Sequence, residues 1–124
     1  MNTIKKESIN QITVDIDEKY DDFMDGHHFL EIRKRVYDQL SPLSAKREIR
    51  RSSGDHVHIR ITFYREITLF ESLCIRAFLD DDPVRLACDL TRYYRTGAIE
   101  NTGRCFDEKY TKGQTRKAGA WWSF

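Results

Sequence analysis

The sequence predicts one small α+β domain, built from an antiparallel or mixed sheet with helices packed on one face. Two observations predict this class. Segments in which apolar and polar residues alternate, as in strands, are interspersed with segments of helical periodicity. The chain also has 124 residues, the usual length of one domain, so residues 1–124 are expected to form a single unit.

The first predicted strand covers residues 11–17. Apolar side chains alternate with polar ones along it, as in a strand with one buried face. The apolar face consists of Ile12, Val14 and Ile16, and the polar face of Thr13, Asp15 and Asp17. Aspartate is unfavourable in strands, so two aspartates on one strand face indicate that something compensates for their placement.

The sequence pattern of residues 21–63 predicts a loop, a helix and two strands. The acidic residues 21–26 are expected to form the loop. Over residues 28–40 apolar side chains recur at intervals of three and four, which is typical of an amphipathic helix. Residues 45–51 are predicted to be a short edge strand. Residues 56–63 alternate most regularly and give the clearest strand of the chain.

The last third predicts two adjacent helices and a final strand. A Thr-x-x-Glu capping box opens a helix over residues 68–79. An Asp-Pro pair opens a second helix over residues 82–95, with a glycine behind it. Residues 103–110 are predicted to be the last strand.

The cysteines and the N-terminus indicate a cytoplasmic protein. Cys74, Cys88 and Cys105 are odd in number and lack Cys-x-x-Cys spacing, so we interpret them as small buried residues. The first residues lack the apolar segment of a secretory signal. No apolar stretch approaches the roughly 20 residues that span a bilayer, so no membrane association is expected.

Polar side chains of the predicted strands converge on the sheet face that the helices leave free. They are Asp15, Asp17, His56, His58 and Arg60. Asp15 and Asp17 lie two strand residues apart, about 7 Å, which is close enough to share divalent cations. Carboxylate oxygens suit Mg²⁺ or Mn²⁺, and both ions commonly bind phosphates.

Three short motifs occur in order along the chain. They are Val14-Asp15-Ile16-Asp17, Ser53-Gly54-Asp55-His56 and Phe106-Asp107. This series resembles the three motifs of archaeo-eukaryotic primases. The resemblance implies an RRM-like core in which Asp15, Asp17 and Asp107 are catalytic and hold two Mg²⁺ or Mn²⁺ ions. It also implies that the Ser53–His56 segment holds the phosphates of the incoming nucleotide.

Several assignments within this resemblance stay open. His58 is an alternative to His56, and Asp89 to Asp107, although Asp89 falls on a predicted helix. Further candidate phosphate ligands are Arg51, Arg60 and Lys109.

The resemblance implies a replication protein of a virus or plasmid that carries out metal-dependent nucleotidyl transfer. Its partners would be a nucleoside triphosphate and nucleic acid, either DNA or RNA. If the protein is viral, its location would be the host cytoplasm. A homodimer or a larger replication assembly is left open.

A second resemblance gives a different function. His56-Val57-His58 is similar to the His-hydrophobic-His motif of rolling-circle replication initiators, which implies a metal held by the histidines and a tyrosine nucleophile. Tyr93 and Tyr94 are the candidates, but the lysine expected shortly after the tyrosine is absent.

A third reading requires no catalysis. The arginine-rich middle of the chain and an aromatic C-terminus are also compatible with a module that binds nucleic acid or protein. The aromatic residues concerned are Trp121, Trp122 and Phe124.

Overall fold

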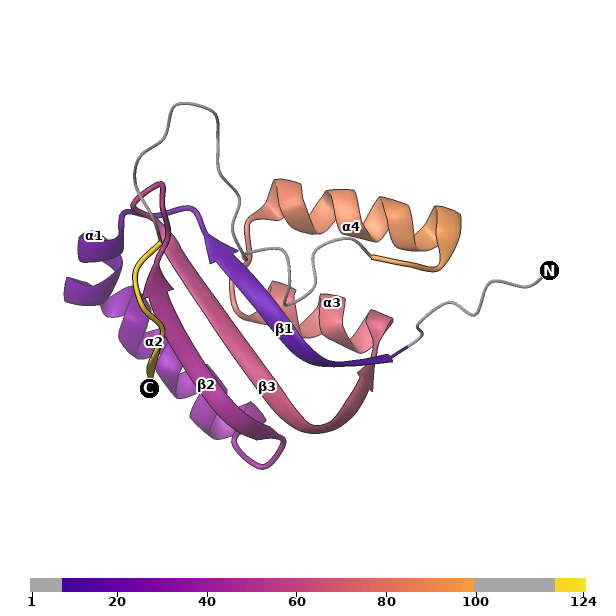
Figure 1. The fold of residues 1–124 in the computed structure, drawn as a ribbon, viewed down its shortest axis with the longest axis horizontal. Helices are drawn as coiled ribbons and strands as arrows, with labels where there is room; N and C mark the ends of the chain where they lie inside the picture. Colours follow the sequence, from indigo (N-terminus) through magenta and orange to yellow (C-terminus); the bar gives the residue numbers. More distant parts are fainter. Residues whose placement is uncertain (1–7, 100–117) are drawn as a thin grey trace.

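The computed structural model describes residues 8–99 and 118–124. Within these ranges an antiparallel sheet has the strand order β1-β3-β2-β4. The strands are β1 (Ser8–Ile16), β2 (Ser44–Arg51), β3 (Val57–Thr68) and β4 (Trp122–Ser123). β3 therefore lies between β1 and β2, and the short β4 brings the C-terminus to the outer side of β2 (Figure 1).

Helices occupy the connections of this sheet. After β1 come α1 (Tyr20–Asp25), α2 (His27–Arg35) and a π-helical turn, η1 (Val36–Leu40); after β3 come α3 (Leu69–Phe78) and α4 (Pro83–Thr96). Figure 1 shows α2 alongside β2, and α3 and α4 beside β1. The predicted α+β class is confirmed.

The core lies between the sheet and the helices. Val57, Ile59 and Ile61 of β3 have no solvent exposure, and neither do Phe23 of α1 and Ile32 of α2. Burial of one such side chain stabilises the fold by roughly 1.5–3 kcal/mol. Because side chains alternate along a strand, the polar residues of the same strands are turned to the side of the sheet opposite α1 and α2.

Three of the four predicted strands are present, with two differences. β1 begins three residues before the predicted residues 11–17, β3 continues five residues past the predicted residues 56–63, and all other ends of β1, β2 and β3 agree with the prediction within one residue. β2 is not an edge strand, however, because β4 pairs with its outer side. The predicted last strand, residues 103–110, lies outside the described residues.

The prediction of a loop over residues 21–26 is wrong. These residues form most of α1, with Asp21 and Asp22 in its first turn, where carboxylates interact favourably with the helix dipole. Phe23 anchors the helix because its side chain is fully buried. One buried residue in an acidic stretch shows no periodicity, so the sequence pattern did not predict this helix.

The helix starts agree with the predicted capping. The Thr68 hydroxyl accepts a hydrogen bond of 3.0 Å from the Glu71 amide, and the Glu71 carboxylate accepts one of 2.9 Å from the Thr68 amide. At α4 the Asp82 carboxylate accepts from the Val84 amide at 2.9 Å. Gly97, in the left-handed region with φ 71°, ends α4.

The prediction that the cysteines are buried is wrong for two of them. Cys74 on α3 and Cys88 on α4 are exposed, because each helix turns a different side toward the sheet. Cys105 lies outside the described residues. In the described ranges, no helix combines the length and apolar character needed to cross a membrane.

Candidate functional site

The polar face, the side of the sheet opposite α1 and α2, collects charged residues from three strands. Strand register sets Asp15 beside His58 and His58 beside Arg50, and it sets Thr13 beside Arg60 and Arg60 beside Glu48. Two rows of polar side chains thus cross the sheet. The polar face consists of Thr13, Asp15, Asp17, Glu48, Arg50, His56, His58 and Arg60.

Asp15 lies where the loop between α3 and α4 meets the edge of β1. Its amide donates to the Asp81 carboxylate at 2.8 Å, and its carbonyl accepts from the Asp82 amide at 2.7 Å. Burial raises the pKa of the Asp15 carboxyl; Arg85 counteracts this rise, whereas Asp81 and Asp82 add to it. The tertiary fold therefore partly buries the Asp15 carboxyl and surrounds it with charged side chains of both signs.

Asp17 has a more open environment than Asp15. Its side chain is 70% exposed, and one carboxylate oxygen lies 3.4 Å from Nδ1 of His56. The predicted residues Asp15, Asp17 and His56 are therefore neighbours at one end of the polar face. His56 belongs to this acidic end.

His58 interacts with arginine rather than with an acid. Nε of Arg50 donates a hydrogen bond of 3.2 Å to Nδ1 of His58. Burial, followed by the charges of Arg50 and Arg85, lowers the pKa of His58 to about 3. His58 is therefore neutral at physiological pH, and it orients the Arg50 guanidinium as an uncharged acceptor.

Arg60 is held by a carboxylate on the neighbouring strand. Its Nε donates to Glu48 at 3.0 Å. Burial raises the pKa of Glu48, but the hydrogen bond and charge of Arg60, together with Lys46, outweigh this effect and keep the pKa below its ordinary value. Glu48 thus stays ionised and fixes the position of Arg60.

Arg50 was not among the predicted site residues, and Trp121 was named only as a candidate aromatic residue of a binding module, without a place beside the arginines. Arg50 belongs to the polar face, and the Trp121 ring centroid lies 4.3 Å from Cζ of Arg50 and 4.1 Å from Cζ of Arg60. The alternation of Arg50 with buried Ile49 was a usable signal for its orientation. The sequence could not predict that Trp121 lies beside these arginines, because its position depends on pairing between β4 and β2.

Arg51 does not belong to the polar face. Its guanidinium bonds to Asp55 and Asp21 and lies 4.5 Å from the Tyr20 ring centroid. Alternation explains this, because Arg51 follows Arg50 and points to the other side of β2.

The turn containing Ser53 and Gly54 uses several polar groups internally. The Ser52 hydroxyl accepts from the His56 amide at 2.9 Å, and the Ser52 carbonyl accepts from the Asp55 amide at 3.0 Å. These two amides close the hairpin between β2 and β3. A phosphate cradle of backbone amides at this turn therefore receives little support from the geometry.

The third carboxylate of the predicted site is not defined by the structure. Asp107 and Lys109 lie outside the described residues. The alternative, Asp89, lies on α4 as expected and accepts a hydrogen bond of 2.8 Å from buried Arg76. Among the residues that the structure describes, no three His, Cys, Asp or Glu side chains are grouped so as to hold a metal ion.

The structure gives little support to the site of a rolling-circle initiator, which would need both histidines on one metal ion and a tyrosine beside them. His56 contacts Asp17 whereas His58 contacts Arg50, so the two imidazoles interact with different neighbours. Tyr93 packs against the core and lies 6.4 Å from the Phe70 ring, while Tyr94 is 74% exposed.

The fold and the polar face define a class of protein: a small α+β domain whose sheet presents acids, histidines and arginines on the side opposite α1 and α2. No family model matches the chain, and neither curated proteins nor solved structures gave a significant match.

Proposed function

We propose that the polar face binds a nucleoside triphosphate together with Mg²⁺ or Mn²⁺ and transfers its nucleotidyl group to nucleic acid. The observation that carries this proposal is the register of β1 on β3, which sets Asp15 beside His58 and brings Asp17 near His56. Carboxylates suited to a cation thus lie on the same face as two arginines suited to phosphates.

The proposed cation ligands are Asp15 and Asp17, with Asp107 outside the described residues. Two carboxylates fit such a role, because Mg²⁺ usually keeps several waters and shares the phosphates of its substrate. A cation held there would neutralise phosphate charge as a hydroxyl group of the nucleic acid attacks the α-phosphorus. The bond between the α- and β-phosphates breaks in this step, and pyrophosphate leaves. The exposure of Asp17 gives the phosphates access to this end of the face.

The arginines supply the positive charge that a triphosphate requires. Arg60 is held by Glu48, and Arg50 is oriented by neutral His58. A guanidinium fixed by neighbours loses less conformational entropy when it binds an anion. The two arginines would therefore orient the phosphates toward the carboxylates at the other end of the face.

Calorimetric titration with Mn²⁺, with and without a nucleoside triphosphate, tests this proposal. Asp15→Asn and Asp17→Asn keep the side-chain volume but remove the negative charge. We expect each variant to weaken metal-dependent triphosphate binding at least about ten-fold, because loss of one cation ligand costs on the order of 1.4 kcal/mol or more. Primer-extension assays should show a matching loss of product.

Asp38→Asn provides the matched control. Asp38 is an exposed carboxylate on η1, and its substitution should leave binding unchanged. Triphosphate binding that survives in both Asp15→Asn and Asp17→Asn contradicts the proposed site.

The binding-module alternative is favoured by one observation, the aromatic ring of Trp121 beside two arginines. Rings and guanidiniums on a sheet are typical of surfaces that bind single-stranded nucleic acid. Such a module would bind an oligonucleotide without added metal and would tolerate Asp15→Asn. The same set of variants therefore separates the two functions.

A further inference from the structure

The C-terminal strap, residues 118–124, is fixed on the outer side of β2. The Gly119 amide donates to the Arg51 carbonyl at 2.8 Å, and the Phe124 amide donates to the Arg47 carbonyl at 3.1 Å. Between these bonds, Trp122 and Ser123 pair with Ile49 and Glu48. The backbone on both sides of the tryptophans is thus held in register with the sheet.

The two consecutive tryptophans of the strap have different surroundings. Trp122 donates from Nε1 to the Tyr20 hydroxyl at 3.1 Å and lies 6.2 Å from the Phe29 ring, so it faces the helices. Trp121 contacts Arg50 and Arg60, and its ring centroid lies 6.5 Å from that of His58. Because side chains alternate along a strand, Trp121 lies on the polar face and Trp122 lies on the opposite face, toward the helices.

Trp121 has the chemistry of a stacking platform. Its ring is partly exposed, and two guanidiniums hold it in place from the sheet. Nucleobases stack on such rings whatever their sequence, because every base has a π face. A ring positioned in advance by other contacts loses little entropy when a base stacks on it.

We propose that Trp121 stacks against the base of a nucleotide whose phosphates extend across the polar face toward Asp15 and Asp17. This inference rests on the proposed function and names the base-recognition part of the same site. β2 and β1 are two strand spacings apart, about 10 Å, a span that the ribose and phosphates of a nucleotide can cover. Trp121 would thus bind the ligand without regard to base identity.

Tryptophan fluorescence tests this proposal directly, because the chain has only two tryptophans. Trp122→Phe leaves Trp121 as the emitter, and Trp121→Phe leaves Trp122. With Mg²⁺ present, we expect a nucleoside triphosphate to quench the emission of Trp122→Phe and to leave that of Trp121→Phe unchanged. Equal quenching of both variants, or of neither, overturns the proposal.

Calorimetry with a base-free probe separates stacking from indirect effects. Trp121→Ala should weaken nucleoside triphosphate binding roughly ten-fold, whereas inorganic tripolyphosphate should bind the variant and the wild type equally. Trp122→Phe is the control and should bind both probes like the wild type. If Trp121→Ala loses both probes equally, Trp121 acts only by positioning the arginines, and the stacking proposal is wrong.

The outcomes also distinguish this inference from the function on which it rests. A wild-type protein that binds neither probe contradicts the proposed function and the stacking role together. A wild-type protein that binds both probes, with no change in Trp121→Ala, contradicts the stacking role alone. Circular dichroism and the thermal midpoint of each variant confirm that it is folded before binding is compared.

Discussion

Two histidines show how strongly the tertiary environment sets the state of one residue type. Nδ1 of His28 lies 2.6 Å from Glu18, and Nε2 lies 2.8 Å from Asp80. Partial burial lowers the pKa of His28, but the hydrogen bonds to both carboxylates outweigh it and raise the pKa above its ordinary value. His58, buried beside Arg50, is shifted in the opposite direction.

The raised pKa of His28 predicts a pH-dependent contribution to stability. This contribution is fully present below the unfolded pKa, near 6.5, and is lost as the pH rises through the folded pKa. His28→Gln should therefore lower the free energy of unfolding more at pH 5.5 than at pH 9. The difference should stay below about 1 kcal/mol, because the ion pairs are partly exposed.

Urea denaturation of the wild type and His28→Gln at both pH values measures this effect. The exposed neighbour His27 supplies the control, because His27→Gln removes a histidine without affecting Glu18 or Asp80. An equal cost of His28→Gln at both pH values contradicts the prediction. His58 is present in the wild type and in both variants, so its contribution to the pH dependence of stability cancels when they are compared.

At the scale of an element, the side of α4 that faces α3 and the sheet buries charged residues that form ion pairs. Arg76 of α3 bonds to Asp81 at 2.7 Å and to Asp89 at 2.8 Å, and Arg85 bonds to Asp81 at 2.8 Å. Arg85 also donates to the Thr13 carbonyl at 3.0 Å. The network thus joins α3 and α4 to the edge of β1 that pairs with no other strand in the described part of the chain, and it covers an edge that could otherwise pair with another chain.

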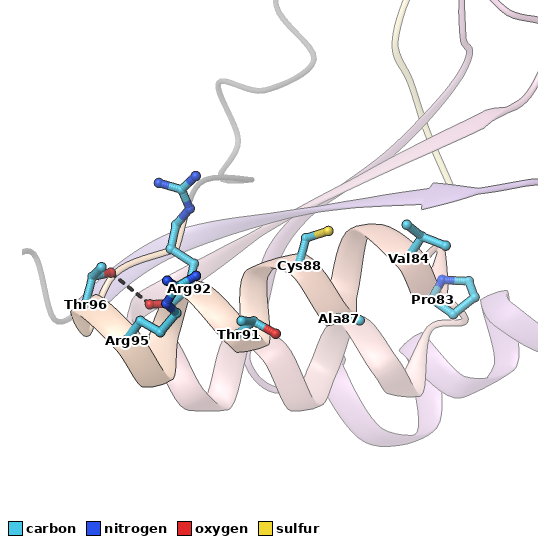
Figure 2. Close-up of a pocket in the computed structure, with 8 residues that line it drawn as sticks. All are labelled: Pro83, Val84, Ala87, Cys88, Thr91, Arg92, Arg95 and Thr96. Carbon is cyan, nitrogen blue, oxygen red and sulfur yellow. Dashed lines mark hydrogen bonds between the residues drawn. The ribbon is translucent and has the colours of Figure 1, made fainter.

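The other side of α4 is open. Figure 2 shows the residues that line a hollow of about 870 Å³ along this helix, from Pro83 and Val84 at its start to Arg95 and Thr96 at its end. Val84 is 70% exposed. Among the described residues, α4 is thus held by this charged network and by Tyr93, which packs against the core.

Removal of Arg76 should destabilise the protein strongly. Arg76→Met leaves Asp89 and Asp81 buried without this cation, and breaking a buried pair in this way costs about 3–5 kcal/mol. Arg76→Met/Asp89→Leu should recover part of the loss, because it removes both charges of one pair. Urea denaturation measures both variants, with exposed Arg95→Met as the control. A cost below about 1 kcal/mol for Arg76→Met contradicts this account.

At the scale of the whole molecule, the strap connects the sheet to the helices. The Phe124 carbonyl accepts from the Tyr37 hydroxyl of η1 at 3.2 Å, and the Phe124 ring lies 6.0 Å from the Phe29 ring. Trp122 bonds to Tyr20 of α1. The strap thus bonds to residues 87 and 102 positions earlier in the sequence, and Figure 1 shows it passing along the outer side of β2.

Trp122→Ala tests the contribution of the strap to stability. The substitution removes the ring that packs on Phe29 and the hydrogen bond to Tyr20. Because Trp122 is 41% exposed, we expect a loss of about 1–2 kcal/mol, below the 3–5 kcal/mol typical of a fully buried tryptophan. Chemical denaturation measures it. Tyr94→Ala, an exposed aromatic control on α4, should change stability by less than about 0.5 kcal/mol.

Much of the fold and part of the site follow from local rules. Alternation along β1 and β3 predicted that Asp15, Asp17, His56, His58 and Arg60 share one face, and the pairing of Asp15 with His58 agrees. The capping box at the start of α3 was also predicted. Such features involve residues close in sequence, whose geometry depends on the periodicity of a strand or on one turn of helix.

The tertiary structure decided which distant residues meet. It set Arg50 beside His58, brought Trp121 onto both arginines, and paired β4 with β2 so that β2 became an inner strand. These features depend on which segments pair and which surfaces are buried together. The sequence by itself therefore determined the polar face of each strand, whereas long-range pairing, driven by burial of the whole core, decided how those faces combine.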